Sequence, residues 1–378
     1  MPKKTNTKIN GSNYFRVTAT IGTNADGSPI RKQFYGSSKK EAEDKRDEYV
    51  MNIKKGLSPH FDKALFRHVF ETWFENVLTP SISLSSRNRY EMDYRLRIKD
   101  CALSEMKLVD IKSIHVQAYY NDLLNTYTLN TVKQTHKLLR SFFIYCIKAD
   151  LIIKSPLLAV ELPKDKLVSD TNKPISDNDI KKLLQAANEN IENFIFVFAV
   201  FSGLRLGEIL SVTYSDLDLE NNTVHVNKSV KYLNVEGKWQ AVLSPTKTLH
   251  STREVPILDA VQKLLQAHIR REKQKHLKLG MPFTGDSILF SSYSGTYREA
   301  SNVRKMLMRL CDKMSMERTT FHSLRHTFCT ILAKQEVPLK TASVLMGHGD
   351  IGITAKIYTH VDNHELKRGI EKLSVYFE

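Results

Sequence analysis

The order of hydrophobic and polar positions changes character twice along the chain. Residues 14–21 and 30–35 alternate in the manner of two strands, and Asn24-Ala-Asp-Gly-Ser28 between them is typical of a turn. Ser38-Lys-Lys-Glu41 is a capping-box sequence, which predicts that a charged helix follows the second strand. We therefore expect residues 1–57 to form a sheet of two or three strands backed by one helix.

Beyond a boundary predicted at Gly56-Leu-Ser-Pro59, residues 64–160 have the period of an all-helical bundle. Further helices are expected over residues 86–98, 111–124 and 131–149. Apolar stripes mark the first and last helices, at Leu65, Val69, Trp73 and Phe74 and at Leu138, Leu139, Phe142, Phe143 and Cys146. A bundle of this size could bind along one side of a DNA duplex.

A polar stretch with a proline at each end, from Pro163 to Pro174, predicts the main linker. The last domain, residues 174–378, mixes helices with strands. Ser176 is placed to cap its first helix, and one continuous helix is expected over residues 194–210. Strands are expected over residues 223–227, 238–243 and 253–257. The predicted fold class is multidomain α+β: a small β-sheet-plus-helix unit, an all-α bundle, and a mainly α domain with a small antiparallel sheet.

The charge of the chain favours a polyanionic partner. There are 56 Lys and Arg residues against 41 Asp and Glu, which gives a formal charge of +15 and a pI near 9.4. A basic soluble enzyme without a nucleic-acid partner could have the same balance. Residues 1–60 alone contain 12 basic and 6 acidic residues, a net charge of +6.

Two groups of basic residues are candidates for DNA contact, although a solvated basic face would have the same composition. The candidates are Arg16, Arg31 and Lys32 in the first unit and Arg87, Arg89 and Arg95 in the second.

Cysteine usage and hydropathy predict an intracellular protein without a zinc site. The four cysteines are scattered and form no C-x-x-C pair, so we expect reduced thiols. The longest apolar stretch, around residues 194–201, is too short to span a bilayer, and the N-terminus has no apolar signal core. A cytoplasmic location and no membrane contact are the expectations.

The residues that carry chemistry lie mostly near the C-terminus. His322-Ser-Leu-Arg325-His326 is followed by Gly347-His348-Gly349 and then by Tyr358, and a distant Arg205 completes the set. A phosphodiester is anionic, and the planar arginine fork donates two hydrogen bonds to phosphate oxygens while staying charged. Tyrosine can act as the nucleophile and hold the phosphate covalently. These are the groups needed to cut and rejoin a DNA strand through tyrosine.

Each of these residues also has an ordinary structural interpretation when it is taken alone. Arg205 precedes Glu208 by three residues, which is the spacing of a common helical ion pair. Lys247 lies in a predicted turn between two strands, where a lysine is usually solvated. Gly347 is a plausible helix C-cap that would leave His348 free to point into a cleft.

In this order and spacing, the chain resembles the tyrosine recombinase family, also called phage integrases. The family signature is an early arginine, a β-hairpin lysine, H-x-x-R, a later histidine, and a tyrosine about ten residues beyond it. Here these positions are Arg205, Lys247, His322, Arg325, His348 and Tyr358, with 358 − 348 = 10 between the last two. The resemblance covers about residues 64–378. The three-part layout is similar to integrases of temperate phages and conjugative transposons, whose N-terminal unit binds arm-type DNA sites.

The resemblance implies a role for each signature residue. Arg205 and Arg325 would bind the non-bridging oxygens of the scissile phosphate, and His348 would donate to it. Tyr358 would be the nucleophile. His322 would accept the proton of the tyrosine, and Lys247 would donate a proton to the departing 5′-oxygen. Glu208 would be a supporting group that holds the site together.

The implied function is a site-specific recombinase that integrates and excises a mobile element through a 3′-phosphotyrosyl intermediate. It would need no metal, ATP or other cofactor. Its implied partners are double-stranded DNA at core and arm sites, three further copies of itself on paired duplexes, an excisionase and a host DNA-bending protein in a bacterial nucleoid. A tail stripe, Leu366, Ile370 and Leu373, could dock on a neighbouring protomer or cap its own domain.

Two other functions remain open from the residues. One is a non-catalytic DNA-binding or architectural protein, which would not need a nucleophile flanked by two arginines. The other is a type IB topoisomerase, which uses similar chemistry but relaxes supercoils as a monomer. The separate basic N-terminal unit disfavours the second.

Overall fold

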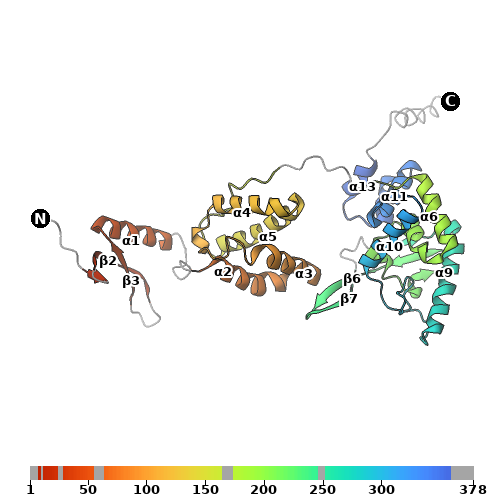
Figure 1. The fold of residues 1–378 in the computed structure, drawn as a ribbon, viewed down its shortest axis with the longest axis horizontal. Coiled ribbons are helices and arrows are strands. Elements are labelled where there is room, and N and C mark those ends of the chain that lie inside the picture. The colour runs from red at the N-terminus through yellow and green to blue at the C-terminus, as the bar shows by residue number, and fades with distance from the viewer. Residues whose placement is uncertain are drawn as a thin grey trace, which may run out of the picture. The chain divides into compact units, whose positions relative to one another are not determined.

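The computed structural model describes residues 7–9, 12–23, 29–54, 64–163, 173–245 and 252–358. The chain divides into two compact units, Met1–Lys166 and Leu167–Glu378, and each is described by itself (Figure 1). Several predicted features lie outside the described residues: the turn at 24–28, the boundary at 56–59, most of the linker at 163–174, Lys247, and the tail stripe from Leu366 to Leu373.

The first part of unit one is a three-stranded antiparallel sheet with one helix. The strands β1 (Thr7–Ile9), β2 (Ser12–Thr23) and β3 (Pro29–Gly36) are followed by α1 (Lys39–Lys54). Helix α1 packs on β2 and β3, with the Phe34 and Tyr49 rings 5.2 Å apart (Figure 1). The Ser38 hydroxyl accepts from the Glu41 N–H, as the capping box predicts, whereas the Glu41 carboxylate accepts from Ser37 instead of Ser38. The predicted sheet backed by one helix is confirmed.

The second part of unit one is the predicted helical bundle. Its helices are α2 (Phe66–Trp73), α3 (Leu84–Asp93), α4 (Ser113–Thr126) and α5 (Leu129–Lys148). Wider π-helical turns extend α2 to Leu78 and α3 to Ile98. The stripe on α5 is buried as predicted, whereas on α2 the stripe was placed incompletely. Phe66 and Phe70 are buried there, and Leu65 is only half-buried. The aromatic side chains of α2 reach α5, because their spacing directs them to one helix face.

Unit two is mainly helical around a small sheet. The strands β4 (Leu217–Asp218), β5 (Thr223–Val226) and β8 (Arg253–Pro256) form one antiparallel sheet, and β6 (Lys228–Val235) and β7 (Lys238–Pro245) form a separate hairpin. The helices are α6 (Asp177–Glu189), α7 (Phe194–Ser202), α8 (Leu206–Ile209), α9 (Asp259–Lys278), α10 (Ala300–Lys313), α11 (Phe321–Lys334), α12 (Leu339–Met346) and α13 (Ile351–Tyr358). The Ser176 hydroxyl accepts from Asp179 N–H, so the predicted cap of α6 is present. Helix α7 is buried on all sides and forms the centre of the core.

Two predictions for unit two were wrong. The continuous helix over 194–210 is broken at Gly203, whose φ of 62° is left-handed and ends α7. A Cβ at this position would lie 2.2 Å from the Phe328 ring, so the break requires glycine. The strand β6 was missed because its side chains do not alternate between buried and exposed. Its turn, Glu236-Gly237, has positive φ at both residues, which is the geometry of a type I′ hairpin.

No helix among the described residues is long and apolar enough to cross a bilayer.

Candidate active site

The break after α7 places Arg205 at the start of α8. Arg205 is the N-cap residue, and the two carboxylate oxygens of Glu208 bind it at both ends. Glu208 Oε2 accepts from the Arg205 backbone N–H at 2.9 Å, and Oε1 accepts from Arg205 Nη1 at 2.9 Å. The predicted pairing of these residues is therefore present, although Glu208 is almost fully buried and the Arg205 side chain is 43% exposed. Glu208 thus holds the guanidinium in place while part of the side chain remains exposed to solvent.

Arg325 on α11 and Arg205 are held close together because both donate hydrogen bonds to backbone carbonyls at the end of α12. Arg325 Nη1 donates to Gly203 O and Arg325 Nη2 to Met346 O, both at 2.5 Å. Arg205 Nη2 donates to Gly347 O, the next carbonyl along the chain, at 3.2 Å. Burial and then the neighbouring Arg205 cation lower the pKa of Arg325. An anion bound between the two guanidinium groups would relieve this repulsion.

His322 precedes Arg325 by one turn of α11, and both side chains line a cavity of about 490 Å³. Arg205 and Arg304 of α10 line the same cavity. Burial lowers the pKa of His322, and the Arg325 cation lowers it further. The imidazole is therefore neutral at neutral pH, which is the state that can accept a proton.

His348 follows the C-cap of α12. Gly347 has a φ of 61°, so the predicted C-cap is confirmed, and His348 Nδ1 lies 2.8 Å from Thr354 Oγ1 of α13. Burial lowers the pKa of His348 to about 4, helped by Arg325 and Arg205. When the Thr354 hydroxyl donates to Nδ1, the proton of the neutral ring is on Nε2, which is then a donor for an anion.

Tyr358 ends α13, and its hydroxyl donates to Val337 O at 3.1 Å. Burial raises the pKa of this phenol. Within the described part of the chain, no hydrogen bond joins the hydroxyl to Arg205, Arg325 or either histidine. The structure thus brings five predicted site residues together and leaves the tyrosine bonded to a backbone carbonyl.

Sequence reasoning missed one residue in this region, Arg253 of β8. It is 7% exposed, and its Nη2 donates to Glu208 Oε2 at 3.1 Å. The available signal was its position in Arg-Glu-Val-Pro, where the arginine alternates inward together with Val255. A charged residue at an inward position of a strand needs a buried partner.

The basic candidates of the first unit lie on two faces of the sheet. Arg16 pairs with Tyr35, and Arg31 pairs with Thr20, so both arginines project from the same exposed face. Lys32 belongs to the alternate set and lies on the side of α1, with its Nζ 3.6 Å from the Tyr49 ring centre. Lys32 therefore does not share the face of the two arginines.

The candidates in the bundle differ in how free their charges are. Arg87 pairs with Glu91 at 2.7 Å, whereas Arg89 and Arg95 are exposed. A further arginine of the same stretch, Arg97, pairs with the buried Asp93 at 2.5 Å and stabilises the bundle itself.

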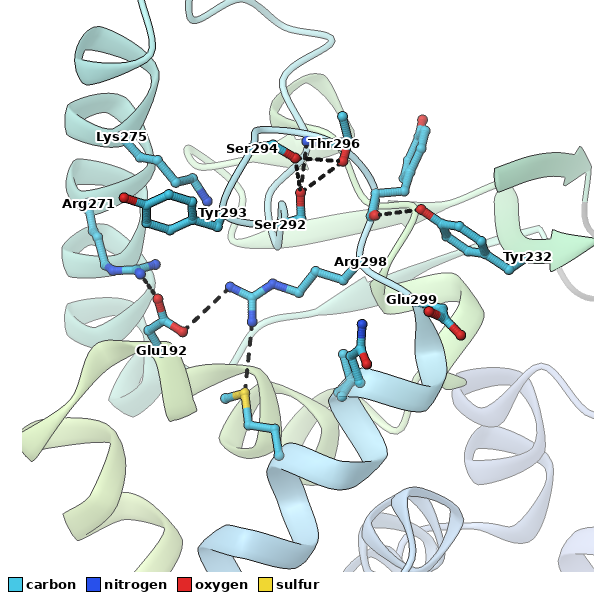
Figure 2. Close-up of a pocket in the computed structure, with 14 residues that line it drawn as sticks. Glu192, Tyr232, Arg271, Lys275, Ser292, Tyr293, Ser294, Thr296, Arg298 and Glu299 are labelled. Carbon is cyan, nitrogen blue, oxygen red and sulfur yellow. Dashed lines mark hydrogen bonds and ion pairs between the residues drawn. The ribbon is translucent and has the colours of Figure 1, made fainter. Parts of the chain in front are cut away.

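A second cavity in unit two, about 440 Å³ in volume, is lined by charged groups but is electrostatically balanced (Figure 2). Arg271 and Arg298 both pair with Glu192, as the dashed lines in Figure 2 show. Lys275 pairs with the fully buried Glu272 at 2.6 Å. With Glu299, which also lines the cavity, three carboxylates match the three cations, and the cavity is a poor site for an anion.

Comparison with known proteins identifies the class. The family model described as "Phage integrase family" matches residues 173–365, just over half of the chain. The chain belongs to the phage integrase family. A second model, "Phage integrase, N-terminal SAM-like domain", matches residues 65–124 of this integrase.

Individual relatives agree with this assignment. "Tyrosine recombinase XerC-like" of Caldanaerobacter subterraneus subsp. tengcongensis is 34% identical over 391 residues, which cover 100% of both chains. The "Integrase" of Staphylococcus phage L54a is 24% identical over 82% of this chain and 93% of its own. Among solved structures, the Tn1549 transposon integrase in complex with a circular intermediate DNA has a TM-score of 0.68 at 21% identity and covers 81% of this chain and 99% of that one.

These findings confirm the resemblance and the fold class predicted from the sequence. This phage integrase family member is a site-specific DNA recombinase, an enzyme that breaks and rejoins DNA strands.

Proposed function

We propose that this recombinase cuts DNA with Tyr358 as the nucleophile, on a phosphate bound by Arg205, Arg325 and His348, to integrate and excise a mobile element. The observation that carries the proposal is the meeting of the two arginines at consecutive carbonyls, Met346 O and Gly347 O. Two fixed cations at one point match the two non-bridging oxygens of a phosphodiester.

The surroundings of Arg205 support a nucleic-acid ligand. Arg205 lines the cavity it shares with His322 and also a second one of about 800 Å³ on the side of β6 and β7. Arg304 lines both cavities as well. A partly exposed guanidinium between two open cavities is placed to bind the phosphates of a long anionic backbone that crosses both.

The proposed chemistry is phosphoryl transfer in which no atom or charge is lost. The Tyr358 oxygen attacks phosphorus while its proton passes to His322, and the bond to the 5′-oxygen breaks as Lys247 protonates that oxygen. The 3′-phosphate is then esterified to tyrosine. In rejoining, the 5′-hydroxyl of another strand attacks the same phosphorus, the tyrosine leaves, and the protons return. The ester retains the energy of the cut bond, so ATP is not needed.

A division of labour among three segments is part of the proposal: residues 1–57 for arm sites, 64–160 for core sites and 174–378 for catalysis. The SAM-like match at residues 65–124 and the integrase match at 173–365 support the last two segments. The positive first segment, with Arg16 and Arg31 on one open face, supports the first. The Tn1549 integrase complexes with circular intermediate DNA support a mobile-element substrate.

Deletion of residues 1–57 should spare core-site cleavage and abolish binding to arm-type sites. The reason is that α1 and the sheet pack on each other and contain none of the site residues around Arg205. Covalent adduct formation on a nicked core duplex measures cleavage, and an electrophoretic mobility shift on an arm duplex measures binding. Loss of core cleavage by the truncated protein would contradict the proposed division of labour. The double variant Arg16→Ala, Arg31→Ala in the full chain controls for misfolding, because it should lose arm binding alone.

The second-order rate constant of covalent adduct formation should stay level as the pH is lowered through 6.5 and decline only at more acidic values. This constant reports the ionisation of the free enzyme. Burial and the arginines lower the pKa of His322 and His348, so both neutral forms persist below the ordinary histidine value of 6.5. Protonation then removes the acceptor and the rate falls.

A rapid-quench pH series with DNA below saturation gives the midpoint of that decline. Core-site binding measured at each pH is the control for unfolding. A midpoint at or above 6.5 with intact binding would contradict the assigned protonation states.

We also propose that four protomers assemble on two paired core sites, and that an excisionase and a host DNA-bending protein set the direction of exchange in the nucleoid. The lambda integrase dimer bound to a core site, similar in fold at a TM-score of 0.58, supports assembly on DNA. Incubating the protein with two core-site duplexes tests the whole proposal through recombinant products and particle mass. Relaxation of supercoils by a monomer without recombinants would favour a topoisomerase instead.

A further inference from the structure

Arg253 is buried between the two elements that supply Arg205 and His348. Its Nη2 donates to Glu208 Oε2 at 3.1 Å, and its Nε donates to Leu345 O at 2.8 Å. The first bond leads to α8 and the second to the end of α12. The side chain is only 3% exposed, so it meets these groups in a space that excludes solvent.

These contacts close a ring of hydrogen bonds. Glu208 binds Arg253 through one oxygen and the Arg205 guanidinium through the other. Arg205 in turn donates to Gly347 O, two residues beyond the Leu345 carbonyl that Arg253 binds. A ring restrains each member from two sides, so the direction of the Arg205 guanidinium depends on Arg253.

The same guanidinium packs against the turn that carries His348. A Cβ at Gly347 would lie 2.7 Å from Arg253 Nη1 and 2.9 Å from its Cζ. The guanidinium therefore occupies the space that a side chain at residue 347 would need. His348 follows directly, so the position of its imidazole depends on this contact.

We propose that Arg253 is a positioning residue for strand cleavage, which sets the Arg205 guanidinium and the His348 imidazole in one arrangement around the scissile phosphate. The inference rests on the proposed function of those two residues. Arg253 is buried beneath them and acts through Glu208 and the turn at Gly347.

The chemistry of the side chain suits this role. Burial opposes ionisation of Glu208, yet the Arg253 cation and its hydrogen bond keep the pKa of that carboxyl below its ordinary value. Arginine is required because Nε and Nη2 bind different elements in fixed directions. A lysine has one nitrogen and cannot occupy both positions.

Arg253→Lys keeps the charge opposite Glu208 and removes the fixed geometry. We expect its rate of covalent adduct formation on a nicked core-site substrate to fall about 10- to 100-fold, the usual effect of removing a group that orients a ligand-binding residue. Core-site affinity should stay at the wild-type value, since Arg253 is buried. A wild-type cleavage rate in this variant would overturn the inference.

A substrate with a neutral methylphosphonate at the scissile position separates positioning from general damage. Such a phosphorus centre has lost one anionic oxygen and needs less cationic stabilisation in the transition state. Most of the Arg253→Lys defect should therefore disappear on it, relative to wild type on the same substrate. A defect of equal size on both substrates would mean that the residue serves folding alone.

Gly347→Ala tests the same contact from the opposite side if Arg253→Lys does not fold. The added methyl group meets the Arg253 guanidinium, so this variant should show the same defect and the same recovery on methylphosphonate. Gly280→Ala is its matched control, because Gly280 has a similar φ of 66° but no atom within 4 Å of the added Cβ. Equal cleavage rates for the two alanine variants would count against the inference.

Arg298→Lys controls for the loss of a half-buried, paired arginine. Arg298 donates to Ser291 O at 2.7 Å and lies in the balanced cavity of Figure 2, outside the ring, so its variant should cut at the wild-type rate. Tyr358→Phe distinguishes a failure of the proposed function from a failure of the positioning role of Arg253. Adduct formation by Tyr358→Phe would refute the proposed function, whereas wild-type cutting by Arg253→Lys and none by Tyr358→Phe would refute the positioning role alone.

Discussion

Tyr358→Phe should bind core-site DNA like the wild type and form no covalent adduct. Phenylalanine keeps the ring where α13 ends and removes only the oxygen that would attack phosphorus. The lost hydrogen bond to Val337 O is worth about 1 kcal/mol, so the fold should persist. A nicked suicide substrate resolved under denaturing conditions measures the adduct. The assay is run in excess EDTA, because the arginines, the lysine and the histidines can supply the charge that the reaction needs.

Tyr119→Phe is the matched control for that experiment. The Tyr119 hydroxyl also donates to a backbone carbonyl, Arg97 O at 2.9 Å, and lies in the helical bundle. This variant loses an equivalent hydrogen bond and should still form the adduct at the wild-type rate. A covalent band that persists in Tyr358→Phe would transfer the nucleophile's role to another residue.

Arg205→Ala and Arg325→Ala should each slow cleavage about 10²- to 10³-fold, by analogy with the loss of one transition-state donor elsewhere. Their effects on stability should differ. The Arg205 side chain is 43% exposed, and Glu208 retains Arg253 as a partner, so the Arg205→Ala variant should unfold near the wild-type temperature. Removing Arg325 leaves Gly203 O and Met346 O buried without a donor, at a cost of about 1–3 kcal/mol each.

Single-turnover cleavage and thermal unfolding, measured on both variants, separate the two effects. Arg318→Ala removes an exposed cation paired with Asp312 and is the control for net charge. Near-wild-type cleavage by either alanine variant would contradict its phosphate-binding role.

Local sequence rules predicted the elements whose signals are local. The Ser38 and Ser176 caps and the apolar stripe of α5 were correct because each depends on residues within a few turns. The break at Gly203 was missed because the surrounding residues favour helix. The absence of a Cβ there is required by the Phe328 ring, which comes from a distant helix. The facing of Lys32 likewise depends on strand register, which a single strand pattern does not specify.

The candidate site divides in a similar way. Family spacing indicated Arg205, His322, Arg325 and His348, and the structure places all four around the ends of α7 and α12. Their chemistry alone would not have predicted this, since every one has an ordinary role in isolation. Arg253 escaped notice because its partners are 45 and 92 residues away in sequence. The hydrogen bond from the Tyr358 hydroxyl to Val337 O could not be predicted from a sequence pattern either, because its acceptor is a backbone carbonyl that every residue has.

Backbone carbonyl oxygens, and not side chains, accept several of the hydrogen bonds that orient the two arginines, and this affects which substitutions the site tolerates. The carbonyls of Gly203, Met346 and Gly347 hold the two arginines in place. Every amino acid supplies the same carbonyl, so the bond to the carbonyl of residue 346 does not depend on its side chain, which packs in the core. Only the two glycines are constrained, because the backbone there must turn left-handed. At these three carbonyl positions, the directions of the arginines thus depend on chain conformation more than on the identity of the side chains.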